Sequence, residues 1–194
     1  GVSLHLTWND THLSFGWEGT DLSALEEGAD LFVYLNTSEG GSALSSDWGF
    51  SHVLPFAADH AFVLEDSSYH AVMAHGASGW STTHEENMAT DVHTFPGDRY
   101  IGWSGNQITE VSLPWSAIGD PTQVDFVVWA QWQDAGHVWT AFPPQNPATS
   151  NGAETFTHLY HMPDRNVSTA PASMEIQTAS VVEKADDALN VAIV

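Results

Sequence analysis

The fold class of this chain is decided by its longest apolar stretch, VDFVVWAQW at residues 124–132. Apolar side chains stand at both odd and even positions of this stretch, and the same holds for DLFVYL at residues 30–35. A strand that is apolar on both faces has to be covered on both sides, whereas a strand with one wet face alternates. We therefore expect both stretches to be central strands of a packed sheet.

Shorter segments on either side of these two alternate between apolar and polar residues, which is typical of half-buried strands. Two pairs of such segments, 2–8 with 13–17 and 100–103 with 107–113, are each expected to form a hairpin. Further strands are expected at residues 50–54, 60–65, 69–75 and 155–160, with a break at Pro55, and a short helical turn at residues 114–119. There is no long amphipathic helix. The sequence therefore predicts an all-β fold, an antiparallel β-sandwich (jelly-roll or immunoglobulin-like, with two sheets) that carries a C-terminal strand extension.

A polar, proline-containing linker at residues 162–172 is expected to separate the sandwich, residues 1–161, from a strand-forming tail, residues 173–194. In the tail, Leu189, Val191 and Ile193 alternate on one face of a candidate donor strand, and residues 174–182 are a second candidate strand. Such a segment can complete its own sheet or pair with the open edge of a neighbouring molecule. The sequence leaves both alternatives open.

The charge balance is one-sided, with 25 Asp+Glu against 3 Lys+Arg and a formal net charge of -22. Binding to nucleic acid or to anionic lipid needs clustered Lys and Arg, so this balance argues against both. No apolar run approaches the ~18 residues of a membrane span, so membrane insertion is not expected. Divalent cations and neutral sugars suit such a chain better as partners.

The expected location is extracellular or at the cell surface. Three Asn-X-Ser/Thr sequons, at Asn9, Asn36 and Asn166, are candidate glycosylation sites and agree with the depletion of basic residues. The alternative is a cytoplasmic protein of a salt-adapted cell. The chain has no cysteine, which excludes disulfides, thiol catalysis and Cys-ligated metal sites.

The order of five motifs resembles the DOMON-like superfamily of β-sandwiches, and is most similar to family 9 carbohydrate-binding modules and the C-terminal module of glucodextranases. The motifs are LTWNDTHLSFGWEG (6–19), DLFVYLNTSEGGSALSSDW (30–48), SHVLPFAADHAFVLED (51–66), ITEVSLPWSAIG (108–119) and FVVWAQWQDAGHVWTAFPPQNP (126–147). The resemblance covers residues 2–160 and implies a non-catalytic sandwich that binds carbohydrate and often carries structural calcium. Asn36 and His60 depart from the family pattern, which has Asp and an aromatic residue there. The strand that usually precedes the first motif is missing, so an open sheet edge is expected.

We expect no catalysis, because the motifs that support it are missing or incomplete. The segment His84-Glu85-Glu86-Asn87-Met88 lacks the second histidine of a zinc-protease motif. There is no nucleophile elbow and no glycine-rich phosphate loop, so no nucleotide is expected, and no Met/His pair is placed for haem. A pair of carboxylates at glycosidase spacing stays open, since 25 acids allow many pairs.

The candidate binding residues are tryptophans and acids near loops. Indole faces stack on pyranose rings, and the candidates for glycan stacking are Trp48, Trp80, Trp132 and Trp139, although tryptophan is equally a core residue. In the loop at residues 36–48, Glu39 and Asp47 are the candidate ligands of calcium, which needs six to eight oxygens; the alternative is that they only face solvent. His52 is expected to make a structural hydrogen bond.

Two classes of function follow. The first is an extracellular structural subunit that assembles head to tail with itself into a filament or layer, with strand donation by the tail. The second is a carbohydrate-binding module of a secreted protein, whose partner is a glycan. Polymers seen by electron microscopy would favour the first, and binding to glycans the second.

Overall fold

A computed structural model describes residues 3–18, 29–47, 50–65, 69–87, 101–104, 108–132, 136–148, 151–165 and 175–178. The two doubly apolar stretches form strands β11 (Val124–Trp132) and β3 (Ala29–Asn36), which pair with each other along their whole length in the larger of two main sheets. This sheet has the order β14-β13-β11-β3-β6-β7-β8. Both stretches are therefore interior strands, as predicted.

The remaining strands of the large sheet are added on both sides of this central pair. They are β6 (His60–Glu65), β7 (Tyr69–Gly76), β8 (Gly79–Asn87), β13 (His158–Met162) and β14 (Glu175–Thr178). Strand β12 (His137–Phe142) pairs with the second half of β11, next to the part that pairs with β13. Every ladder between these strands is antiparallel.

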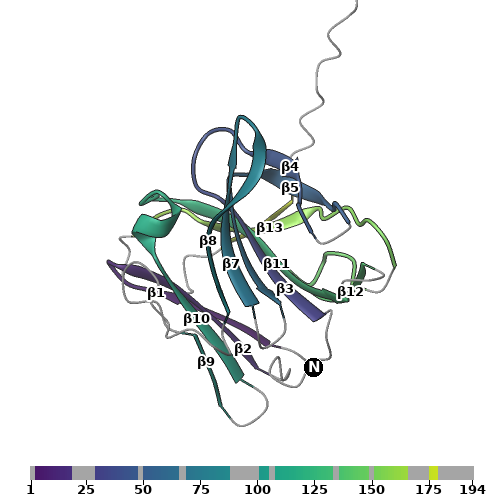
Figure 1. Cartoon of the computed structure of the whole chain (residues 1–194), viewed down its shortest axis with the longest axis horizontal. Coiled ribbons are helices and arrows are strands. Elements are labelled where there is room, and N and C mark those ends of the chain that lie inside the picture. Colours follow the sequence, from purple (N-terminus) through teal and green to yellow (C-terminus); the bar gives the residue numbers. More distant parts are fainter. Residues whose placement is uncertain are drawn as a thin grey trace, which may run out of the picture.

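The second sheet consists of the two predicted hairpins. Strands β1 (Ser3–Trp8) and β2 (His12–Glu18) form one, β9 (Ile101–Ser104) and β10 (Ile108–Pro114) form the other, and β2 pairs with β10 to join them. A 3-10 turn, η1 (Trp115–Ile118), follows β10 where the short helical turn was predicted. In Figure 1 this sheet lies at the lower left, against the strands of the large sheet.

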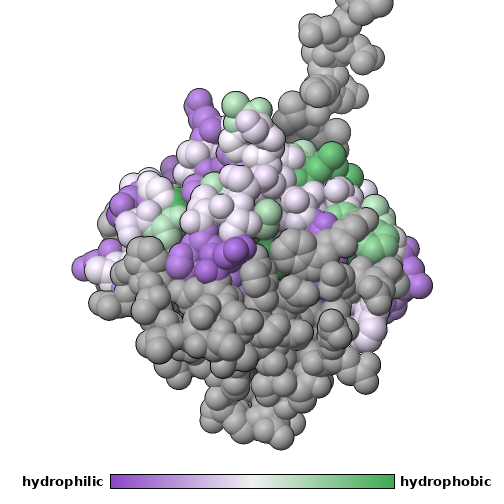
Figure 2. All heavy atoms as spheres, in the orientation of Figure 1, coloured by the Kyte–Doolittle hydropathy of each residue, from purple (hydrophilic) through white to green (hydrophobic). Residues whose placement is uncertain are grey.

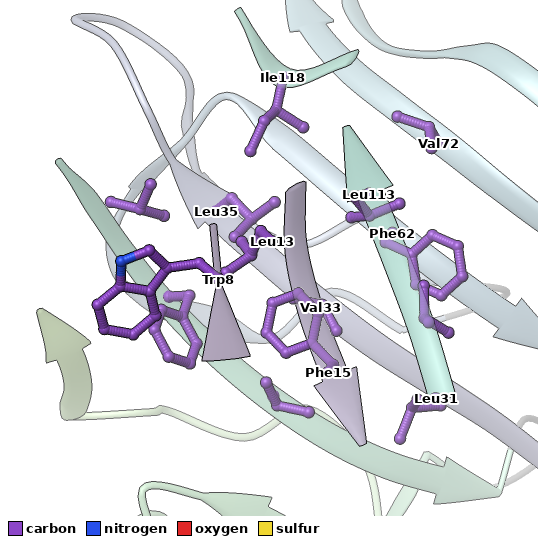
Figure 3. Close-up of a cluster of buried hydrophobic side chains, with 14 of the residues drawn as sticks. Trp8, Leu13, Phe15, Leu31, Val33, Leu35, Phe62, Val72, Leu113 and Ile118 are labelled. Carbon is purple, nitrogen blue, oxygen red and sulfur yellow. The ribbon is translucent and has the colours of Figure 1, made fainter. Parts of the chain in front are cut away.

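The principal core fills the space between the two sheets (Figure 3). Phe15 and Leu113 from the small sheet meet Val33 and Phe126 from the large one, and the rings of Phe15 and Phe126 pack edge to face at 5.8 Å. All four side chains are buried. Burial of large apolar side chains contributes about 2 kcal/mol each, which makes this interface the main source of stability.

A second core covers the opposite face of the large sheet. Tyr34, Phe32 and Trp129 stack on one another, with the Tyr34 and Trp129 rings 5.0 Å apart, and Phe156 packs against them. Their cover comes from a short hairpin, β4 (Ser42–Leu44) with β5 (Val53–Ala58), and from the loop around Phe156. Figure 1 shows this hairpin above the large sheet, away from the small one. The second core explains why β3 and β11 are apolar on both faces.

One predicted boundary was wrong. The expected strand at residues 50–54 ended at Pro55, but β5 begins at Val53 and continues through Pro55 to Ala58. Proline is tolerated there because β5 has a ladder with β4 alone among the described strands, and an edge strand leaves room for a residue without an N–H group. The isolated parallel bridge from Val53 to Thr155 lies before the proline.

The surface of the described residues carries few large apolar side chains. Those that are exposed are Leu44 and Val53, which pair with each other across the β4–β5 hairpin, and Trp139 and Ile176. In Figure 2 the hydrophobic residues of the described part form separate green areas among hydrophilic ones. The described part of the chain has no helix of the length and hydrophobicity that crossing a bilayer requires.

Candidate functional site

Two of the four candidate tryptophans, Trp132 and Trp139, come together in the structure. Their ring centroids are 5.9 Å apart, and the ring planes meet at 60°. Trp139 is 38% exposed and Trp132 is half-buried. The two indoles therefore form an open corner on the surface, at the end of the hairpin made by β11 and β12.

The position of Trp139 results from an irregularity in the strand pairing. Ala130 pairs with Thr140 and Gln131 pairs with Val138, so Trp139 is the extra residue of a β-bulge. A bulge changes the direction in which its side chain points, because the extra residue interrupts the regular alternation of side chains between the two faces of the sheet. At the hairpin end, Gly136 lies against the ring of Phe50. A Cβ atom at this position would lie only 2.7 Å from that ring, so a glycine is needed for the contact.

Polar groups lie next to this corner. His137 is the cross-strand partner of Trp132, and its Nδ1 is 2.7 Å from Oδ1 of Asn151. His137 is half-buried and Asn151 is exposed, so both side chains are accessible from solvent. Aromatic faces flanked by an imidazole and an amide are the chemistry that recognises pyranose rings and their hydroxyl groups.

The other two candidate tryptophans do not join this corner. Trp80, on β8, packs edge-on against Tyr34 at 5.2 Å, and its Nε1 donates a hydrogen bond to the carbonyl oxygen of Leu44 at 3.1 Å. It therefore attaches the β4–β5 hairpin to the large sheet and has a structural role. Trp48 lies outside the described residues.

The predicted structural hydrogen bond of His52 is present, within a buried polar network. The backbone N–H of Glu154 donates to Nδ1 of His52 at 2.9 Å, so the imidazole carries its proton on Nε2 and donates to Oε1 of Gln131 at 2.7 Å. Trp129 Nε1 donates to the same oxygen at 2.8 Å. Desolvation lowers the pKa of His52, and the ring stays neutral near pH 7.

Asp47 belongs to the same network and cannot act as an exposed ligand. Its side chain is fully buried, accepts hydrogen bonds from Ser45 Oγ at 2.6 Å and Tyr34 Oη at 3.2 Å, and lies 3.4 Å from His52 Nε2. Burial raises the pKa of Asp47 to about 7, although the bonds from Ser45 and Tyr34 act in the opposite direction. Burial, followed by the charge of Asp47, also raises the pKa of Tyr34 well above its ordinary value.

The two candidate calcium ligands are therefore not part of one site, because Glu39 is exposed and Asp47 is enclosed. Within the described ranges, no three His, Asp or Glu side chains are grouped so that they could hold a metal ion. Calcium binding stays a prediction that the structure does not test.

A polar pocket of about 430 Å³ lies where β3 ends and β11 begins, and the sequence did not indicate it. Its polar lining includes Asn36, Glu39, Gln123 and Asp125. The loop that forms one wall is fixed by Asp59, which accepts bonds from Thr37 N at 2.8 Å and Ser38 Oγ at 2.6 Å.

Asp59 stays ionised at neutral pH. Burial alone would raise its pKa, but hydrogen bonds from His60, Ser38 and Thr37 outweigh burial and lower the pKa to about 2. The pocket lies at the other end of the sheet from the tryptophan corner, since Asn36 pairs with Asp125 and Ala29 with Trp132, about 24 Å along the strands.

The two sequons that the structure describes differ in accessibility. Asn9 is exposed, as expected, and its Oδ1 accepts hydrogen bonds from the backbone N–H groups of Thr11 and His12, both at 2.8 Å. Asn36 is half-buried and not exposed as expected, because its Nδ2 donates to Asp125 Oδ2 at 3.1 Å. Asn166 lies outside the described residues.

The tail is described in one short part. Strand β14 pairs with β13 of the same chain, so this part of the second candidate segment, residues 174–182, extends its own sheet. Leu189, Val191 and Ile193 lie outside the described residues.

Comparison with known proteins gives no further guide: no family model matches the chain, and no curated protein or solved structure shows significant similarity to it. The family resemblance therefore rests on the five sequence motifs alone.

Proposed function

We propose that this chain is a non-catalytic β-sandwich module that binds carbohydrate through Trp132 and Trp139. The observation that carries the proposal is the bulge that presents Trp139 at the surface, in contact with Trp132. Among the side chains whose exposure the structure describes, Trp139 is the one aromatic residue in the group of exposed large hydrophobic residues. Tryptophan offers a large rigid face at little cost in conformational entropy, which suits stacking against a sugar ring.

The angle between the two indoles narrows the class of ligand. Rings at 60° cannot both lie flat on one planar surface, such as the face of a crystalline polysaccharide. They can enclose a single pyranose ring, with one indole against its face and the other against its edge. The proposed ligand is therefore a soluble glycan, held at one residue or at a chain end.

The test is binding of the purified chain to a panel of soluble polysaccharides by affinity electrophoresis. Trp139→Ala and Trp132→Ala are expected to weaken binding at least tenfold, while Trp139→Phe keeps an aromatic face and retains most of it. Leu44→Ala, which removes an exposed apolar side chain elsewhere, is the matched control and leaves binding unchanged. Retardation of both alanine variants equal to that of the unaltered chain would overturn the proposal.

A second candidate function is self-assembly, and a feature of the tail favours it. Strand β14 is the last strand of the large sheet among the described residues, it is four residues long, and its Ile176 is 48% exposed. An edge strand presents unpaired N–H and C=O groups, which can pair with a strand from another molecule. An extracellular or cell-surface location fits both candidate functions.

Electron microscopy of the native protein and of a chain without residues 173–194 tests this second candidate. Polymers of the native chain, together with a folded monomer after deletion, would support assembly through the tail. If the native chain is monomeric at high concentration, self-assembly is excluded. Unfolding of the shortened chain would mean that the tail stabilises its own sheet.

A further inference from the structure

Arg165 stands out because the chain has only 3 Lys+Arg, and the structure places this one in the wall of a pocket. The pocket has a volume of about 440 Å³ and is lined by Trp8, Asn9, Asp10, Thr11 and Arg165. It lies between the turn of the first hairpin and the segment that follows β13. No part of the tryptophan corner contributes to it.

The guanidinium group of Arg165 is held in position but makes few hydrogen bonds. The backbone N–H of Arg165 donates to Thr122 O at 2.9 Å, and the guanidinium lies 5.2 Å from the ring centre of buried Trp115. Within the described part of the chain, its ionic contact joins Nη1 to Asp120 Oδ1 at 3.4 Å, and the Asp120 side chain is 64% exposed. Among the described residues, none accepts a hydrogen bond from Nε or Nη2.

A second, independent donor lies in the same wall. Trp8 is 9% exposed, and its Nε1 is buried without a hydrogen-bond partner in the described chain. In Figure 3 this nitrogen lies on the side of the ring away from Leu13 and Phe15. Buried donors are almost always paired in native proteins, so an acceptor oxygen that reached this closed-off nitrogen, after a small shift of the ring, would be stabilised there.

The turn adds a third donor. Asn9 Oδ1 is occupied by bonds from Thr11 N, Thr11 Oγ1 and His12 N, which orients the amide and leaves Nδ2 available in a chain that carries no glycan at Asn9. The turn itself is fixed against η1, because Trp115 Nε1 donates to Asn9 O at 2.8 Å and Trp115 N to Thr11 O at 3.0 Å. The donors therefore sit on a rigid frame.

We propose that this pocket binds a small carboxylate ligand, whose oxygens accept hydrogen bonds from Arg165, Trp8 Nε1 and Asn9 Nδ2. The planar guanidinium matches a carboxylate with two parallel bonds, which a neutral hydroxyl group cannot reproduce. Asp10 also lines the pocket, and its negative charge weakens the binding of an anion. This repulsion distinguishes the proposal from recognition of a neutral polyol, for which Asp10 would be a favourable acceptor.

The test compares glucuronate with glucose, two probes that share a pyranose ring and differ by one carboxylate. Binding is followed by the indole N–H resonance of Trp8 in a ¹H–¹⁵N spectrum, identified by its loss in Trp8→Phe. This signal reports the pocket and is insensitive to ligand at Trp132 and Trp139. Glucuronate is expected to shift it, with at least tenfold higher affinity than glucose.

Two variants and one control complete the test. Arg165→Gln should weaken glucuronate binding at least tenfold, and Asp10→Asn should tighten it several-fold. Glu85→Gln, which removes one negative charge as Asp10→Asn does, but from an exposed position on β8 at the opposite edge of the large sheet, should leave the affinity unchanged. Equal shifts with glucose and glucuronate, unaltered binding by Arg165→Gln, or weaker binding by Asp10→Asn would each overturn the proposal. Asp10→Asn and the pair of probes keep it testable if Arg165→Gln does not fold.

Discussion

Two aspartates in the interior, Asp47 and Asp59, have pKa values that are shifted in opposite directions. Asp47 has its pKa raised to about 7 by burial, and Asp59 has its pKa lowered to about 2 because hydrogen bonds outweigh burial. A carboxyl whose pKa is raised on folding contributes stability below its unfolded pKa, and that contribution is lost as the pH rises to the folded pKa. For Asp59 the sign is reversed, and stability is lost as the pH falls from about 4 toward 2.

The replacement Asp47→Asn tests this assignment. Between about pH 4 and pH 7 the unaltered chain should lose stability relative to the variant, by at most about 1.4 kcal/mol per pH unit. Urea unfolding at pH 4, 5.5, 7 and 8 measures the difference in the free energy of unfolding between the unaltered chain and the variant. Asp59→Asn is the control, and its difference from the unaltered chain is expected to stay constant over this range. Parallel stability curves for the unaltered chain and Asp47→Asn would show that Asp47 is ionised throughout.

At the scale of elements, the periodicity of the sequence was sufficient to predict most strands. The two doubly apolar stretches and the two hairpins are found where alternation placed them, because burial on one or two faces leaves a direct pattern in the sequence. The bulge at Trp139 leaves no such pattern, since it depends on a one-residue shift in pairing with β11. The pocket around Asp125 and the pocket at Arg165 depend on which strands become neighbours, and no local signal reports that.

The β4–β5 hairpin, which covers the second core, depends on the close approach of two backbones. Gly41 has φ +90°, and a Cβ atom there would collide with the backbone of Ala58. Gly41→Ala should therefore detach the hairpin and destabilise the chain by about 2 kcal/mol or more. Thermal unfolding measures the loss, and Gly40→Ala is the matched control, because φ is +111° but no atom lies within 4 Å of the added Cβ. Equal melting temperatures for the two variants would contradict this account.

At the scale of the whole molecule, a net charge of -22 surrounds a fold with two apolar cores. Such a charge repels anions at long range, so a carboxylate needs a local cation such as Arg165, while neutral sugars are unaffected. Asp47 and Asp59 accept hydrogen bonds from hydroxyl and backbone groups, so neither of these two acids depends on a compensating Lys or Arg. The tryptophan corner is the described surface feature that this charge leaves most suited to an uncharged polar ligand.

The most direct test of carbohydrate binding is a calorimetric titration of the unaltered chain and Trp139→Ala with the soluble glycan that the panel retards most. The account predicts saturable binding by the unaltered chain, at least tenfold weaker binding by Trp139→Ala, and the same melting temperature for both proteins without ligand. Identical affinities for the two proteins would contradict it.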